Sequence, residues 1–62
     1  MSKSAVKQAS DKLQITERFI IARACNQEGI FDPKEIEKYI SMYYMKRLLP
    51  LFIRQYAKEL VA

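Results

Sequence analysis

The sequence predicts an all-α protein: a helix, a glycine turn, and a second helix that is either kinked or followed by a short third helix after Pro50. Half of the residues are hydrophobic, and the 62 residues include one Gly and two Pro. This composition is too apolar for a disordered chain and too poor in turn residues for an all-β chain. The apolar residues also recur at helical spacing. We therefore expect a single small helical domain over residues 10–62.

The first nine residues are expected to form a flexible basic arm, because residues 1–9 carry two Lys and no acid. Ser10 is the expected N-cap of the first helix, since Asp11 would then suit the positive helix end, and Ser4 is the alternative cap. No Pro or Gly occurs in residues 11–28, so the sequence predicts one uninterrupted helix there.

The apolar residues of this first helix fall on two faces. One face holds Leu13, Ile20 and Ala24, and the other holds Ile15, Phe19 and Ala22. At about 100° per residue, these faces lie roughly 120° to 180° apart. A single antiparallel partner helix cannot cover both of them.

A tight corner is predicted at the end of this helix. Gly29 suits the left-handed residue that ends a helix, and Ile30 can fold back on the last turn. Asp32 suits the N-cap of the next helix, with Pro33 at its first position and Glu35 able to reach back to the capping residue. The sequence therefore predicts two helices joined by a short turn.

The second helix also carries two apolar stripes. The early stripe consists of Ile36, Tyr39, Ile40 and Tyr43, and the later stripe consists of Met42, Met45, Leu49, Phe52, Tyr56 and Leu60. The later spacing is close to that of a coiled-coil seam. Pro50 cannot donate a backbone hydrogen bond and disfavours helical geometry at the preceding residue. Two outcomes stay open: a kinked continuous helix, or a third helix from about residue 50 to residue 60.

We predict that the chain completes its core by homodimerisation into a helical bundle. A chain of this length buries only about 60% of the surface that its unfolded form exposes, and both helices are apolar on two sides. The expected intrachain core is Leu13, Phe19, Ile20, Ile36, Ile40 and Tyr43. The expected intermolecular interface is the later stripe of six residues.

The residue types argue against catalysis, cofactors and metal sites. The sequence has no His, one Cys, and no Gly-rich phosphate loop. Cys25 lies near a predicted helix C-terminus, where a thiolate is disfavoured. No apolar run approaches the roughly 18 residues that span a bilayer. We expect a non-enzymatic, intracellular (cytoplasmic) protein with a reduced thiol, and a membrane is not expected among its partners.

Positive charge concentrates near the C-terminus, where residues 41–62 contain four basic residues and one acid. The basic residues are Lys46, Arg47, Arg54 and Lys58. On one continuous helix they would share an arc of roughly 120° beside the later stripe. Such a strip could contact an acidic partner or the phosphates of a nucleic acid, or it could simply keep the protein soluble.

Two functions follow from these surfaces. The leading hypothesis is a small interaction or regulatory protein that self-associates and docks on a macromolecular partner through the apolar stripe and its basic flank. The alternative is a dimeric nucleic-acid-binding regulator that contacts phosphates through the basic strip.

Residues 24–32 resemble the turn of a helix-turn-helix, with a small residue, a Gly four positions after Cys25, and an apolar residue next. The resemblance implies DNA binding by the second helix. It departs from the motif at Ile36, where the closing apolar position comes one residue late. The side chains that would enter the groove carry no net charge: Lys34, Glu35, Glu37 and Lys38.

Overall fold

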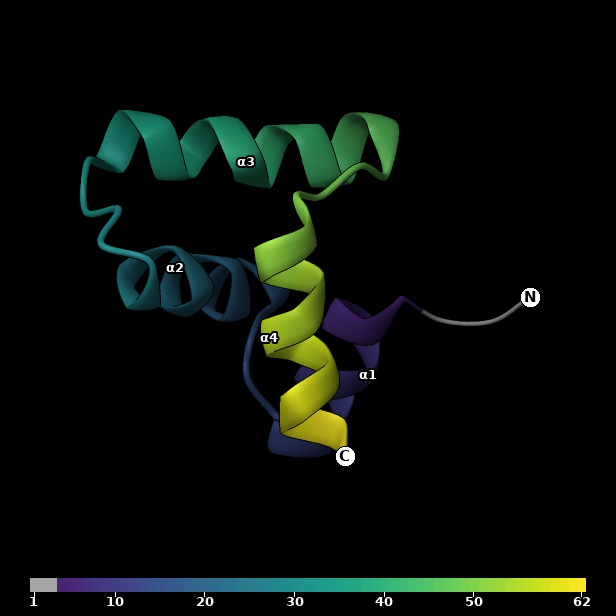
Figure 1. Ribbon diagram of the computed structural model, residues 1–62. Helices are drawn as coiled ribbons and strands as arrows, with labels where there is room; N and C mark the ends of the chain where they lie inside the picture. The colour runs from purple at the N-terminus through teal and green to yellow at the C-terminus, as the bar shows by residue number, and fades with distance from the viewer. Residues whose placement is uncertain (1–3) are drawn as a thin grey trace.

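The computed structural model describes residues 4–62, which form four α-helices and no strand (Figure 1). The helices are α1 (Ala5–Leu13), α2 (Glu17–Gln27), α3 (Pro33–Lys46) and α4 (Leu51–Val61). The all-α prediction is confirmed. The number of helices exceeds the two or three that the sequence predicted, because the chain turns at one place where no turn was expected.

Helix α1 begins at Ala5 because Ser4 caps it. The Ser4 side chain accepts a hydrogen bond from the amide of Lys7 at 3.1 Å. The expected arm over residues 1–9 is therefore wrong for residues 5–9, and the preference for Ser10 as the N-cap is wrong as well. The Ser10 hydroxyl instead donates to the carbonyl of Ile15 at 2.5 Å. The rest of the predicted arm, residues 1–3, lies outside the described residues.

The uninterrupted helix predicted over residues 11–28 is also wrong. Gln14 adopts a left-handed conformation with φ of 57° and ends α1. Thr16 then caps α2 by accepting from the amide of Phe19 at 3.1 Å. A straight helix would leave one of its two apolar faces in water. The break lets Val6 of α1 and Ile20 of α2 both enter the same core.

The corner between α2 and α3 has the predicted left-handed glycine and the predicted Asp32 cap. Gly29 has φ of +81°, and the amide of Ile30 donates to the carbonyl of Cys25 at 2.9 Å. Pro33 opens α3, and the Asp32 side chain caps it by accepting from the amide of Lys34 at 3.0 Å. In Figure 1 the chain reverses here, and α3 lies above α2.

Pro50 separates two helices instead of kinking one. Arg47 is left-handed, with φ of 55°, and its amide donates to the carbonyl of Tyr43 at 3.0 Å. Helix α4 starts directly after Pro50, at Leu51. Figure 1 shows α4 running away from α3 at a steep angle. Of the two outcomes left open, the separate helix after Pro50 is confirmed and the continuous kinked helix is wrong.

The core is a single cluster to which all four helices contribute. Its buried members are Val6, Ala9, Ile20, Ile21, Ala24, Cys25, Ile40, Tyr43, Ile53 and Ala57. Helices α1 and α4 lie side by side and form the most extensive helix contact (Figure 1). Two alanines, Ala9 and Ala57, are fully buried there, since small side chains let helices approach closely.

The predicted intrachain core is confirmed for three residues and wrong for two. Ile20, Ile40 and Tyr43 are buried. Leu13 and Phe19 remain 43% and 48% exposed, because the turn after α1 rotates their faces outward. Ile36, the sixth predicted core residue, is partly buried against the core cluster.

Candidate binding surfaces

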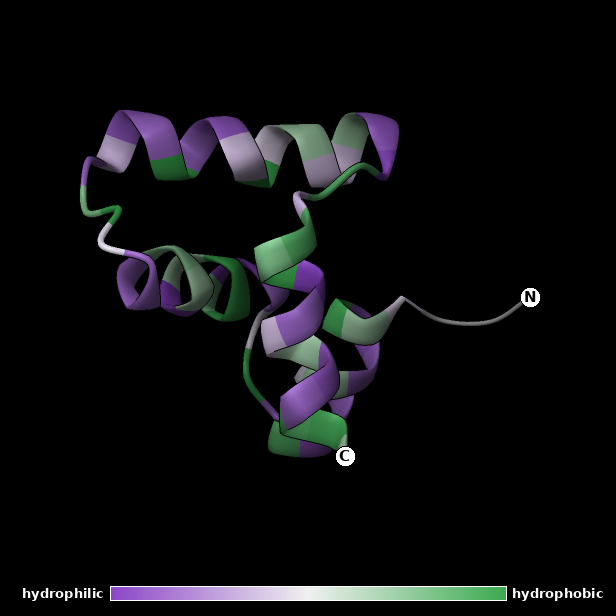
Figure 2. Cartoon of the chain, in the orientation of Figure 1, coloured by the Kyte–Doolittle hydropathy of each residue, from purple (hydrophilic) through white to green (hydrophobic). Residues whose placement is uncertain are grey.

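The later apolar stripe does not survive as one continuous face. Four of its members, Leu49, Phe52, Tyr56 and Leu60, are partly buried against the protein's own core. Phe52 also meets Tyr39 edge to face, with ring centroids 6.0 Å apart. Met42 is partly buried, and Met45 alone among the six is largely free, at 81% exposure. The turn between α3 and α4 separates residues that a straight helix would have aligned. Figure 2 shows that this turn and the first turn of α4 are hydrophobic.

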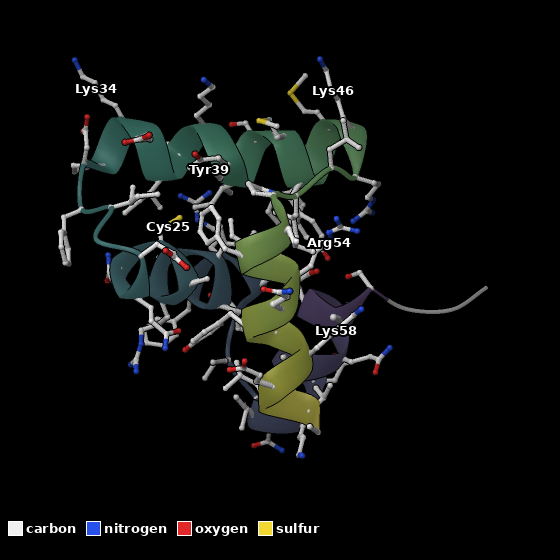
Figure 3. The ribbon with its side chains drawn as sticks, in the orientation of Figure 1. Cys25, Lys34, Tyr39, Lys46, Arg54 and Lys58 are labelled. Carbon is white, nitrogen blue, oxygen red and sulfur yellow. The ribbon has the colours of Figure 1, made fainter. Side chains whose placement is uncertain are left out.

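The basic strip is divided by the same turn. Figure 3 shows that Lys46 extends from the outer side of α3, away from α4. Arg54 and Lys58 extend from the side of α4 that faces the first turn of α1 (Figure 3). The left-handed backbone at Arg47 directs that side chain back along α3, where its guanidinium lies 5.5 Å from the centre of the Tyr43 ring. Three of the four predicted basic residues therefore converge, and Lys46 does not join them.

Arg47, Arg54 and Lys58 surround a cleft of about 180 Å³, which we call the basic cleft. The remaining lining comes from Ser4, Ala5, Val6, Tyr43 and Leu49. Within residues 4–62, no carboxylate oxygen lies within 4.0 Å of the three cationic side chains. The cleft thus combines an aliphatic wall with positive charge that the described part of the chain does not pair.

Tyr43 lines the basic cleft and makes two side-chain hydrogen bonds. Its buried hydroxyl donates to the carboxylate of Glu17 and shares a 2.8 Å hydrogen bond with the Ser4 hydroxyl. Burial is the main cause that raises the pKa of Tyr43, and the hydrogen bond to Glu17 raises it further, while Ser4 and Arg47 act in the opposite direction. The phenol therefore stays neutral and ties α1, α2 and α3 together beside the cations.

A second surface lies between α2 and α3, where a groove of about 430 Å³ is open to solvent. Its lining residues are Thr16, Arg18, Phe19, Ala22, Phe31, Pro33, Ile36, Glu37 and Ile40. Phe19 is 48% exposed and Phe31 is 69% exposed, so two aromatic rings stand at its edges in contact with water. We call this surface the aromatic groove.

The charges around the aromatic groove cancel. Arg18 donates to the carboxylate of Glu37 at 2.6 Å, and these two are the charged residues that line the groove. The Arg23 guanidinium lies 5.7 Å from the centre of the Phe19 ring. Sequence reasoning assigned Phe19 to the core, so it missed this surface. The signal that could have revealed it is the second apolar face of the first predicted helix.

Neither surface carries a reactive group. Cys25 is buried, and burial followed by the nearby Glu35 carboxylate raises the pKa of its thiol. The described residues contain no cluster of three or more side chains suited to hold a metal ion. Among the helices of residues 4–62, none has the length and hydropathy needed to cross a bilayer. What the geometry offers is two surfaces suited to contact other molecules.

Comparison of the chain with protein-family models, with curated proteins and with solved structures gives no match. The class that the fold defines is a small all-α protein. The aromatic groove and the basic cleft are its two candidate binding surfaces.

Proposed function

We propose that this chain is a non-enzymatic binding protein that self-associates through the aromatic groove and docks on a macromolecular partner through the face that carries the basic cleft. The observation that carries the proposal is the pair of exposed rings, Phe19 and Phe31, at the edges of an uncovered apolar groove. Exposed aromatic residues beside a groove are typical of interaction surfaces, because each ring buries a large area when it is covered.

A second copy of the chain is the occupant that this groove fits best. In a two-fold dimer, Phe31 of each copy can enter the groove of the other, so one contact covers both rings of both copies. A standard interface buries about 800 Å² on each partner. That area is under one fifth of the 4499 Å² accessible surface of the chain.

Charge supports the same assignment. The chain carries a net charge of +4, so two copies repel each other less when they meet at a neutral surface than at a basic one. The groove is such a surface, since Arg18 and Glu37 neutralise each other there. The basic cleft is unsuited to a second copy and is suited to a partner of opposite charge. The later apolar stripe is less suited to self-association, because Leu49, Phe52, Tyr56 and Leu60 already pack within the chain.

The test is the mass of the Phe31→Ser variant, measured by light scattering over a range of concentrations. The wild-type mass should rise toward twice 7.3 kDa, and the variant should stay near 7.3 kDa. Leu51→Ser is the matched control, because Leu51 is 59% exposed but lies outside the groove, and this variant should associate like the wild type.

Two results would reject the groove as the self-association surface. One is a wild-type mass of a single chain at every concentration. The other is an equal loss of association in both variants, which would indicate nonspecific hydrophobic association. Circular dichroism melting curves of both variants establish that each is folded when its mass is measured.

A further inference from the structure

We infer that the basic cleft binds the phosphodiester backbone of a nucleic acid. The inference rests on the proposed function, in which this face meets the partner, and it names the chemistry of that partner. It also assigns the contact to three residues, Arg47, Arg54 and Lys58, and leaves Lys46 out.

The three cations of the basic cleft come from the end of α3 and from α4. Arg47 comes from the left-handed residue that ends α3, while Arg54 and Lys58 come from successive turns of α4. Like charges gathered around one cleft repel each other unless an anion joins them, and no carboxylate of residues 4–62 does so. The planar guanidinium of an arginine can hold two oxygens of a phosphate at once.

The basic cleft is too small to enclose a whole small molecule. Its volume of about 180 Å³ is smaller than the roughly 300–1,000 Å³ of pockets that enclose a whole small molecule. The cleft can take one group of a larger anion, while the rest of that anion lies across the surface. A polymer with a repeated anionic group meets this requirement.

The basic cleft combines positive charge with an aliphatic wall. In a nucleic acid each phosphate is flanked by sugar carbons, and the cleft places Ala5, Val6 and Leu49 beside its cations. The wall formed by Ala5 and Val6 is the first turn of α1, whose peptide dipoles also favour negative charge. Phosphate contacts of this kind position a protein on a nucleic acid without reading its sequence.

The assignment differs from the helix-turn-helix resemblance. In that motif α3 would be the recognition helix, yet its exposed first turns carry Lys34, Glu35, Glu37 and Lys38 with no net charge. Three cations that no carboxylate of residues 4–62 pairs gather instead at the basic cleft, between the start of α1, the end of α3 and α4.

The experiment is a fluorescence anisotropy titration of a short labelled DNA duplex, repeated with an RNA duplex, at two salt concentrations. Three phosphate contacts predict a slope of log K against log salt of about −2.7 on DNA, which is about a 40-fold loss of affinity between roughly 50 and 200 mM salt. Binding of either probe with this salt dependence supports the inference.

Two lysine variants locate the contact. Lys58→Gln should reduce the slope to about −1.8, because one contact is lost. Lys46→Gln removes the same charge from a residue of the same sequence-predicted strip, but Lys46 points away from the cleft, so its slope should match the wild type. Equal losses in the two variants would overturn the assignment to the cleft.

Two further outcomes would overturn the inference. One is the absence of binding to both probes at low salt. The other is equal or tighter binding of a polyglutamate peptide in the same assay, which would make the partner an acidic protein. The mass measurement on the same samples separates the proposals: a dimer that binds no nucleic acid rejects only this inference, and a single chain that binds rejects only self-association through the groove.

Discussion

The α1–α4 pair and the α2–α3 pair bury their apolar residues to different extents. Ala9 and Ala57 allow α1 and α4 to approach closely, and the basic cleft lies beside the first turn of α1, at one end of this contact. Helix α3 comes within 8 Å of α2, measured between Cα atoms, but not of α1 or α4. Large side chains such as Tyr39 and Phe52 fill the distance between α3 and α4. Small side chains thus bring α1 and α4 together, whereas larger side chains connect α3 to α4.

The largest loss of stability should come from the closely packed α1–α4 pair. Ile53→Ala removes a fully buried side chain of α4, which should cost about 2–5 kcal/mol. A small domain has a stability of about 3–5 kcal/mol, so this variant should lose about half or more of its stability. Urea denaturation followed by circular dichroism measures the loss.

Leu51→Ala is the matched control for that variant, because Leu51 lies in the same helix but is mostly exposed. Its free energy of unfolding should change by less than about 0.5 kcal/mol. Similar losses in both variants would show that α4 does not pack through the Ile53 side, and the contrast between the two helix pairs would fail.

A smaller loss of stability is expected at Tyr43 of α3, whose hydroxyl bonds to Ser4 at the start of α1 and to Glu17 of α2. Tyr43→Phe removes the hydrogen bonds to Glu17 and Ser4 and should cost about 1 kcal/mol at pH 7. The pKa of Tyr43 is raised in the folded state, so its stabilising contribution is complete below the ordinary tyrosine pKa of about 10 and is lost as the pH rises through the folded value. The stabilities of the wild type and the variant should therefore converge above about pH 10.

Tyr44→Phe is the control for removal of a hydroxyl, since Tyr44 packs its ring against Tyr43 but is 45% exposed. Its free energy of unfolding at pH 7 should differ little from that of the wild type. A constant gap between the wild type and Tyr43→Phe between pH 7 and alkaline pH would contradict the role given to the buried phenol.

Local signals in the sequence predicted the parts of the fold that local chemistry determines. Gly29, Asp32 and Pro33 mark the corner between α2 and α3, and Pro50 marks the start of α4. The break at Gln14 was missed because it contains neither Gly nor Pro. Thr16 followed by Glu17 is a helix-start signal that could have located it.

The two surfaces were less predictable, because they depend on how the helices pack. The basic strip was predicted as four residues. Lys46 lies apart from the other three because the chain turns at Arg47, where the sequence has no glycine to mark the turn. The aromatic groove depends on where α3 lies relative to α2, so the second apolar face of the first predicted helix indicated an uncovered surface but not that Phe31 lines it together with Phe19.

In the proposed function, the aromatic groove and the basic cleft perform separate tasks. The most direct test is sedimentation of the wild type and of Phe31→Ser with an excess of the labelled DNA duplex, counting the protein chains in each complex. We expect two chains in the wild-type complex, and one chain in the variant complex with the same affinity per chain. Failure of Phe31→Ser to bind the duplex, or the same number of chains in both complexes, would contradict it.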